Sequence, residues 1–211
     1  MNMTKELIIV FVKNIKLVKV KTRLAKTIGN QAAFEVYSEL VKITEQATKE
    51  TIADKRIYFS DTIVETKWGT HFKATQEGID LGERMKNAFN KGFADGYERI
   101  VLIGSDLPDI NASHLKAGLQ ALKQNEVVFG PAIDGGYYLI GMTKMNDPVF
   151  DNKPWSQPNL LKLTLSELEQ KNISYTLLEA LNDIDTFKDL EASTFYKTNQ
   201  KLRQRIQQLN D

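Results

Sequence analysis

The segment from Leu7 to Val12 is a continuous run of apolar residues, and it constrains the fold more than any other feature of the chain. A strand with one solvated face alternates apolar and polar residues, whereas a strand buried on both faces does not. The run is also far too short to span a bilayer, so no membrane span is expected. We therefore expect this segment to be a central strand of a parallel sheet.

Further strand and helix patterns alternate along the chain. Strands are expected at 55–60, 71–76, 99–104, 126–129, 137–142 and 174–178, and helices at about 30–47, 80–95, 115–122, 157–171 and from 187 onward. Alternation of this kind predicts an α/β fold, a Rossmann-like three-layer sandwich with a mostly parallel sheet. The strands on either side of Asp134 are too close for a crossover helix, which predicts a small antiparallel insertion. Without a repeat or linker, residues 1–211 should form one domain.

Composition narrows the class of protein. Lys and Arg number 28 against 27 Asp and Glu, a net charge of +1, which argues against a nucleic-acid partner because such proteins usually carry a basic stripe. The chain has no cysteine, which excludes disulfides and thiolate metal sites. The apolar run follows Lys5-Glu6 without a cleavage site, so no signal peptide is expected. Together these features predict a cytoplasmic protein.

A basic segment follows the first strand, where ligands of open parallel sheets bind. Its cationic residues suit phosphate oxygens, although a solvated basic loop is an equally simple interpretation. The spacing is not that of a Walker A loop, and no dinucleotide-binding glycine pattern is present. The cationic residues are Lys13, Lys16, Lys19, Lys21 and Arg23.

Carboxylates follow two other predicted strands. Asp106 lies in the segment 104–108, Gly-Ser-Asp-Leu-Pro, directly after an apolar strand. Hard oxygen ligands select Mg²⁺ or Mn²⁺, and Mg²⁺ typically takes one or two carboxylates together with substrate phosphates. Asp183 and Asp185 follow the last strand, and Asp185 could be a second ligand. The alternative for Asp106 and for Asp185 is that each only caps a turn or helix.

Two other segments have both a structural and a functional interpretation. Asp134-Gly135-Gly136 is a turn signal, but paired glycines also let backbone N–H groups face a ligand, and Tyr137 could line a pocket or belong to the core. The segment 76–85 opens a helix, where Arg84 could reach a phosphate or pair with a nearby acid.

Taken in order, these motifs resemble the glycosyltransferase-A-like nucleotide-diphospho-sugar transferases. Within that superfamily the chain is similar to a bacterial branch of uncharacterised glycosyltransferases, which resembles the phospholactate and molybdenum-cofactor guanylyltransferases. The matching segments run through nearly the whole chain: Phe11-x-Lys13, 20–24 (Val-Lys-Thr-Arg-Leu), 76–85, 104–108, 130–141 and Asp183-Ile184-Asp185-Thr186.

The resemblance implies a nucleotide or nucleotide sugar and a small-molecule acceptor as substrates, and Mg²⁺ or Mn²⁺ as cofactor. It implies a role for Asp106, Lys21 and Arg23 in catalysis and for Asp106 and Asp185 in holding the metal. The nucleotide side would comprise Phe11, Lys13, Lys21, Arg23, Gly82, Arg84 and Ser105, and the acceptor or sugar side Asp134, Gly135, Gly136 and Tyr137.

The chain departs from the family pattern in the basic loop. The family usually carries Pro and Gly where this chain has 14–19, and Gln157 replaces the usual Thr. Loss of Pro removes a fixed φ, and loss of Gly removes a position free to take positive φ. The basic loop should therefore be more mobile or shaped for a different nucleotide. Three hypotheses therefore stand: glycosyl transfer from a nucleotide sugar, nucleotidyl transfer with pyrophosphate release, and non-catalytic nucleotide binding.

Overall fold

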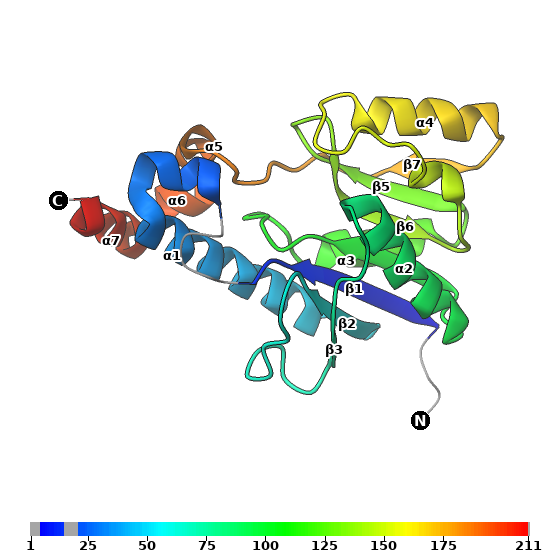
Figure 1. The fold of residues 1–211 in the computed structure, drawn as a ribbon, viewed down its shortest axis with the longest axis horizontal. Coiled ribbons are helices and arrows are strands. Elements are labelled where there is room, and N and C mark those ends of the chain that lie inside the picture. Colours follow the sequence, from blue (N-terminus) through cyan, green and yellow to red (C-terminus); the bar gives the residue numbers. More distant parts are fainter. Residues whose placement is uncertain (1–4, 15–20, 211) are drawn as a thin grey trace.

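The structure is a computed structural model that describes residues 5–14 and 21–210. Seven strands form one sheet in the order β3-β2-β1-β4-β6-β5-β7 (Figure 1). The strands are β1 (Glu6–Val12), β2 (Asp54–Phe59), β3 (Phe72–Thr75), β4 (Arg99–Ile103), β5 (Val127–Pro131), β6 (Tyr137–Met142) and β7 (Tyr175–Leu177). The expected α/β architecture is therefore confirmed.

All neighbouring strands are parallel except where β6 is involved. β6 pairs antiparallel with both β4 and β5, with Ile103 opposite Leu139 and Phe129 opposite Ile140. The predicted antiparallel pair is thus present, and the structure shows where it lies in the sheet. β6 is inserted within the sheet rather than attached to its edge. Because it runs antiparallel, its amino end lies beside the carboxyl ends of β4 and β5, at the same edge of the sheet as the carboxyl end of β1.

Helices cover both faces of the sheet. The helices are α1 (Thr22–Lys49), α2 (Leu81–Ala94), α3 (Ala112–Ala121), η1 (Asp147–Val149), α4 (Leu160–Gln170), α5 (Phe187–Ala192), α6 (Thr194–Thr198) and α7 (Gln200–Asn210). Ile8 and Val10 of β1 pack in the same core as residues of α1 and α3, whereas Leu7 and Ile9 pack in the core of α2 and α4. This burial on both faces explains why β1 is apolar at every position from Leu7 to Val12.

The end of the chain forms a third apolar cluster against the first half of α1 (Figure 1). Leu24 and Ile28 of α1 pack there with Leu202 and Ile206 of α7. α1 has a kink at Gly29, whose φ of 79° and ψ of 159° lie outside the helical region.

The helix α1 begins at Thr22, whereas the sequence pattern indicates a start near Asn30. The part of α1 before the kink at Gly29 is hard to recognise from sequence because its only large apolar residues are Leu24 and Ile28. The partners of these two residues come from α7, near the other end of the chain. Most of the altered basic loop, residues 15–20, lies outside the described residues.

Among the residues that are described, no helix is both long enough and apolar enough to cross a membrane.

Candidate active site

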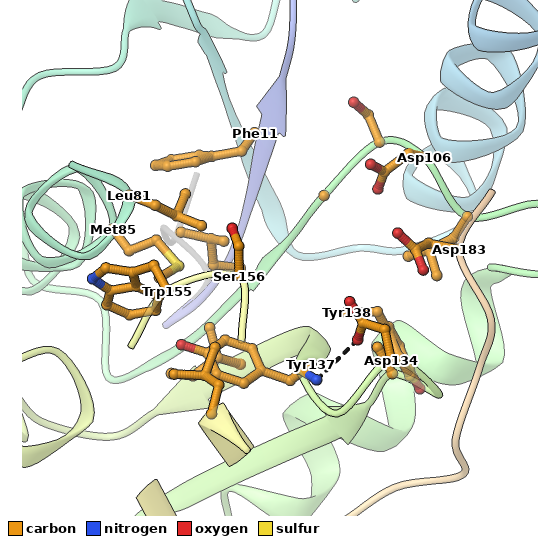
Figure 2. A pocket seen from close by; sticks show the side chains of 18 of the residues that line it. Phe11, Leu81, Met85, Asp106, Asp134, Tyr137, Tyr138, Trp155, Ser156 and Asp183 are labelled. Atoms are coloured by element: carbon orange, nitrogen blue, oxygen red, sulfur yellow. Dashed lines mark hydrogen bonds between the residues drawn. The ribbon is translucent and has the colours of Figure 1, made fainter. Parts of the chain in front are cut away.

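A cavity of about 280 Å³ opens at the carboxyl ends of β1 and β4 and the amino end of β6. Its lining separates into two parts, and Figure 2 shows the labelled side chains of each on opposite sides. We call them the acidic half, with Lys13, Ser105, Asp106, Asp134 and Asp183, and the apolar half, with Phe11, Leu81, Met85, Tyr137 and Trp155.

The acidic half is organised around an ion pair between Lys21 and Asp106. The Lys21 Nζ lies 3.1 Å from Asp106 Oδ2, and the Lys21 side chain is only 1% exposed. Burial raises the pKa of Asp106, but the ammonium groups of Lys21 and Lys13 lower that pKa by more, so it lies below its usual range. Asp106 is therefore ionised at neutral pH, and a buried cation stands beside it.

Lys21 occupies an unusual backbone position directly before α1. Its φ of 48° and ψ of 49° are left-handed, although it is not glycine. Such conformations cost energy and are often found at functional sites, where the surrounding fold enforces them. Here the conformation coincides with the burial of the ammonium group beside Asp106.

Ser105 and Tyr37 connect the ends of β1 and β4 behind the ion pair. The Tyr37 hydroxyl lies 2.7 Å from Ser105 Oγ, and it accepts a hydrogen bond from the Lys13 backbone N–H at 2.9 Å. Burial raises the pKa of Tyr37, so this hydroxyl stays protonated. The two strand ends are thereby held in a fixed relation, which positions Lys13 and Asp106 on the same cavity.

Asn14 fixes the described end of the altered basic loop. Its Oδ1 accepts hydrogen bonds from the backbone N–H groups of Asp61, at 2.7 Å, and Thr62, at 3.1 Å. Its own backbone N–H donates to Ser60 Oγ at 2.9 Å. The residue that begins the departure from the family pattern therefore attaches the loop to the segment after β2.

Asp185 faces basic residues rather than the cavity. Its carboxylate accepts a hydrogen bond from Arg23 at 2.8 Å and lies 4.0 Å from Lys21 Nζ. The alternative that Asp185 caps the following helix does not describe its side chain, because the capping hydroxyl of α5 is that of Thr186. Arg23 is largely exposed and does not line the cavity.

Asp183 is the late carboxylate that lines the cavity. Burial and the negative charge of Asp106 raise its pKa to about 6. Among the described residues its carboxylate has no hydrogen-bond donor. Strict alternation would place Asp183 and Asp185, which are two residues apart, on the same side of an extended segment, so their different surroundings reflect the irregular backbone between β7 and α5, which sequence alone does not predict.

The turn at Asp134 forms another wall. Asp134 Oδ1 accepts a hydrogen bond from the Gly136 backbone N–H at 2.9 Å, and both residues line the cavity. Gly135 has a φ of 92°, and a Cβ there would lie 1.9 Å from the Pro158 carbonyl oxygen. The glycine pair thus allows close packing against the segment before α4, and Gly135 itself faces that segment instead of the cavity.

Four residues expected on the nucleotide side do not themselves line the cavity: Lys21, which lies behind Asp106, Arg23, Gly82 and Arg84. For Gly82 and Arg84 the reason is local packing. A Cβ on Gly82 would lie 2.3 Å from the Trp155 ring, so the indole packs directly on the start of α2. Arg84 Nε donates to the Gly78 carbonyl at 3.1 Å. The structure therefore gives both residues packing partners within the chain.

Several lining residues were not singled out from the sequence. Leu81 and Met85 read as the apolar face of a helix, and Trp155 as an isolated aromatic residue. Their signal is weak because core and pocket residues are of the same types. Leu81 and Met85 lie within the segment 76–85 that matches the resembled family, and that match was the available clue.

The carboxylates at the cavity could hold a metal ion only together with other ligands. Within the described part of the chain, no group of three or more His, Cys, Asp or Glu side chains could hold a metal ion. Three carboxylates, those of Asp106, Asp134 and Asp183, do line one cavity, and a cation, Lys21, already stands beside Asp106. Since Mg²⁺ is usually held by one or two carboxylates plus phosphate and water oxygens, this donor set fits such an ion.

Comparison with known proteins places the chain in a family. The profile described as "Uncharacterized protein conserved in bacteria (DUF2064)" matches residues 42–157. A crystal structure from Desulfovibrio desulfuricans, provisionally named a nucleotide-diphospho-sugar transferase, is 33% identical with a TM-score of 0.86, over 97% of this chain and 99% of that one. No curated protein matches.

More distant structures share the fold. The inositol-1-phosphate CTP transferase of T. maritima is 14% identical with a TM-score of 0.52, over 96% of each chain. The 4-diphosphocytidyl-2C-methyl-D-erythritol synthase of Anaerococcus prevotii is 9% identical with a TM-score of 0.57, over 92% of this chain and 99% of that one. At these identities the likeness concerns the fold alone.

The fold places the chain in the class of proteins with the glycosyltransferase-A-like fold of the nucleotide-diphospho-sugar transferases. More narrowly, the chain belongs to the DUF2064 family. The resemblance drawn from the ordered motifs is confirmed at both levels.

Proposed function

We propose that the protein transfers a glycosyl group from a nucleotide sugar to a small-molecule acceptor with the help of Mg²⁺ or Mn²⁺. The observation that carries the proposal is the buried Lys21 ammonium, 3.1 Å from the Asp106 carboxylate at the wall of the cavity. A fixed ammonium group next to a carboxylate that could bind a metal ion provides two sites of positive charge with which a diphosphate group could interact. The name of the D. desulfuricans relative supports the same substrate class.

The metal would be held by Asp106 and a second carboxylate. We assign that second position to Asp183, because Asp183 lines the cavity with Asp106 whereas Asp185 is engaged by Arg23. When bound, the ion would neutralise negative charge on the diphosphate leaving group. Asp185 would then act on the site by orienting Arg23 and Lys21.

The basic residues would share the charge of the leaving group. In the proposed reaction the bond between the anomeric carbon and the β-phosphate oxygen breaks, and an acceptor oxygen forms the new bond to that carbon. The acceptor proton passes to solvent, and the nucleoside diphosphate leaves. Lys21 is already desolvated, so its ammonium would stabilise the developing phosphate charge more than an exposed lysine would.

The other two hypotheses remain outcomes of the test. In nucleotidyl transfer, a phosphorylated acceptor would attack the α-phosphorus of a nucleoside triphosphate, and pyrophosphate would leave from the same acidic half. A non-catalytic protein would bind the nucleotide without forming either product. Assays for nucleoside diphosphate and for pyrophosphate separate the three.

Calorimetry with nucleoside diphosphates and nucleotide sugars, with Mn²⁺ or with chelator, tests the metal role. Asp106→Asn should weaken Mn²⁺-dependent binding by about tenfold or more, because it removes a ligand charge. The matched control is Asp109→Asn, an exposed carboxylate three residues away, which should leave binding unchanged. Tight binding that neither chelator nor Asp106→Asn alters would contradict the proposal.

The choice between the two late carboxylates has its own comparison. Titration of Mn²⁺ in the presence of a nucleoside diphosphate should show a larger loss of affinity for Asp183→Asn than for Asp185→Asn. The reverse order would assign the second ligand to Asp185 and leave the role of Asp106 intact.

A further inference from the structure

The apolar half of the cavity has a different chemistry from the acidic half. The charged residues that line the cavity are Lys13, Asp106, Asp134 and Asp183. Asp183 and Asp134 act on each other electrostatically, and Lys13 and Asp183 each act on Asp106, so these charges belong together in the acidic half. Among the described lining residues, no Lys or Arg lies in the apolar half. A phosphate placed there would lose its hydration without gaining a cation.

The aromatic walls of the apolar half are held in place by their packing. Phe11, at the end of β1, is 8% exposed and packs against Tyr58 with ring centroids 5.8 Å apart. Tyr137 packs against Phe129 at 5.2 Å. Rings supported in this way lose little conformational freedom when a ligand packs against them.

Trp155 closes the same half from the side of α2. Its ring packs on Gly82 at a distance that excludes any side chain there. Leu81 and Met85, from the first turns of the same helix, line the cavity beside it (Figure 2). The indole is therefore anchored on one side and half-buried, and its remaining surface lines the cavity.

The polar groups in the apolar half are neutral. The Tyr137 hydroxyl is buried without a hydrogen-bond partner among the described atoms, and burial keeps it protonated by raising its pKa. Gln76 donates through Nε2 to the Tyr58 carbonyl at 3.0 Å. Ser156, whose backbone has a left-handed φ of 62°, also lines the cavity. Neutral donors and acceptors of this kind suit the edge of an uncharged ring.

We propose that the apolar half is a ring-binding subsite that takes an uncharged planar ring, with Trp155 as its main specificity-determining residue. The ring could be the base of the nucleotide or a ring carried by the acceptor, and in both cases the phosphates would lie in the acidic half. The proposal rests on the proposed function only for the placement of those phosphates.

Tryptophan fluorescence provides the first test. The chain has two tryptophans, and Trp68 is 2% exposed in the core on the opposite face of the sheet. In a Trp68→Phe background, Trp155 therefore reports alone on the apolar half. The ring-bearing probes, which carry a planar ring, are adenosine, guanosine, cytidine, uridine, benzamide and phenol. The ring-free probes, which carry no planar ring, are pyrophosphate and ribose 5-phosphate.

Ring-bearing probes should quench or shift the Trp155 emission, and ring-free probes should not. A response to nucleosides assigns the subsite to the base, and a response only to benzamide or phenol assigns it to an acceptor ring. If no ring-bearing probe changes the emission, or if ring-free probes change it equally, the ring-binding subsite is excluded.

Calorimetry of the strongest responding probe gives the second test. Trp155→Leu should weaken binding of that probe by about tenfold, as expected for the loss of a stacking surface, and leave Mn²⁺-dependent pyrophosphate binding unchanged. Phe72→Leu, an aromatic-to-leucine change at an exposed position of β3 outside the cavity, is the matched control.

The two proposals fail in different ways. Equal losses of probe and pyrophosphate binding in Trp155→Leu, or no loss of either, would overturn the ring-binding subsite. Absence of metal-dependent pyrophosphate binding in the unmodified protein would instead count against the proposed function and leave the fluorescence result standing.

Discussion

At the scale of single residues, the site depends on charges that the fold has partly removed from water. Lys21 and Asp106 compensate each other, and together they lie beside Asp183, which has no such partner among the described residues. Ionisation of Asp183 therefore costs energy in the free protein because it places a second negative charge near Asp106. A bound cation or a substrate hydroxyl would relieve this cost, which gives an energetic reason for the site to bind one.

The cost can be measured as a dependence of stability on pH. Because the folded-state pKa of Asp183 is raised to about 6, the penalty is absent at low pH, develops as the pH rises from about 4 to 6, and is complete above that range. Asp183→Asn should therefore stabilise the protein at pH 7.5 by about 1–2 kcal/mol, after allowance for partial exposure. Urea unfolding in the presence of chelator should show a smaller difference at pH 4.5.

The control for this measurement is Asp109→Asn, whose carboxylate is exposed. Its effect on stability should be small and should not vary between the two pH values. An equal gain from Asp183→Asn at pH 4.5 and pH 7.5 would show that the carboxylate is not destabilised by its ionisation.

At the scale of elements, the site is built from segments that end or begin at one edge of the sheet. β1 and β4 contribute their carboxyl ends, and β6 contributes its amino end because it runs antiparallel. The turn before β6 then reaches the segment before α4, where Gly135 contacts Pro158 and the Leu161 N–H donates to the Gly135 carbonyl. One glycine thus joins two elements that form the wall of the cavity.

Gly135→Ala tests this junction, and the chain offers a matched control in Gly96→Ala. Both glycines have a φ of 92°, but a Cβ on Gly96 would meet no atom within 4 Å, whereas one on Gly135 would lie 1.9 Å from the Pro158 oxygen. Gly96→Ala should cost about 1 kcal/mol for the left-handed conformation. Gly135→Ala should cost about 2 kcal/mol more because the backbone must also move.

The comparison is made by urea denaturation of the two variants. Equal losses of stability would mean that the contact with Pro158 adds nothing to the conformational cost. A larger loss for Gly135→Ala, with reduced nucleotide binding, is the result that the packing predicts.

At the scale of the whole molecule, the C-terminal helices pack on α1, which comes from the early part of the chain. The first half of α1 packs against α5 and α7, and the segment between β7 and α5 passes the cavity. Along that segment the Ile184 N–H donates to the Asp106 carbonyl at 3.3 Å, and Ile184 itself is fully buried. The C-terminal helices therefore hold Asp183 and Asp185 against the end of β4.

Shortening a core side chain of α7 should lower the stability of the whole chain. Ile206 is 4% exposed, so Ile206→Ala should cost about 2–4 kcal/mol, while Leu209→Ala, at 43% exposure, should cost about 0.5 kcal/mol. Urea unfolding of Ile206→Ala followed by circular dichroism and by tryptophan fluorescence should give coincident transitions if α7 unfolds with the sheet. Separate transitions would show that the C-terminal helices form an independent unit.

The sequence by itself determined the class of fold and the elements that carry the candidate site. Apolar strands that alternate with amphipathic helices have few stable arrangements, and polar residues after those strands must lie at one edge of a parallel sheet. For this reason Asp106, Lys13 and Asp134 could be placed near one another before the strand order was known. The ordered motifs also identified the family, because several weak patterns in one order are specific together.

The tertiary structure decided which member of each local pattern faces the cavity. Alternation alone could not show that Asp183 lines the cavity while Asp185 contacts Arg23, since it would place two residues of this spacing on the same side, and the irregular path of the segment separates them. Nor could helical periodicity show that Gly82 lies under Trp155, because the two are 73 residues apart and meet only through packing. Contacts between distant residues depend on the strand order and on how helices settle on the sheet, and these are properties of the whole chain rather than of any one segment.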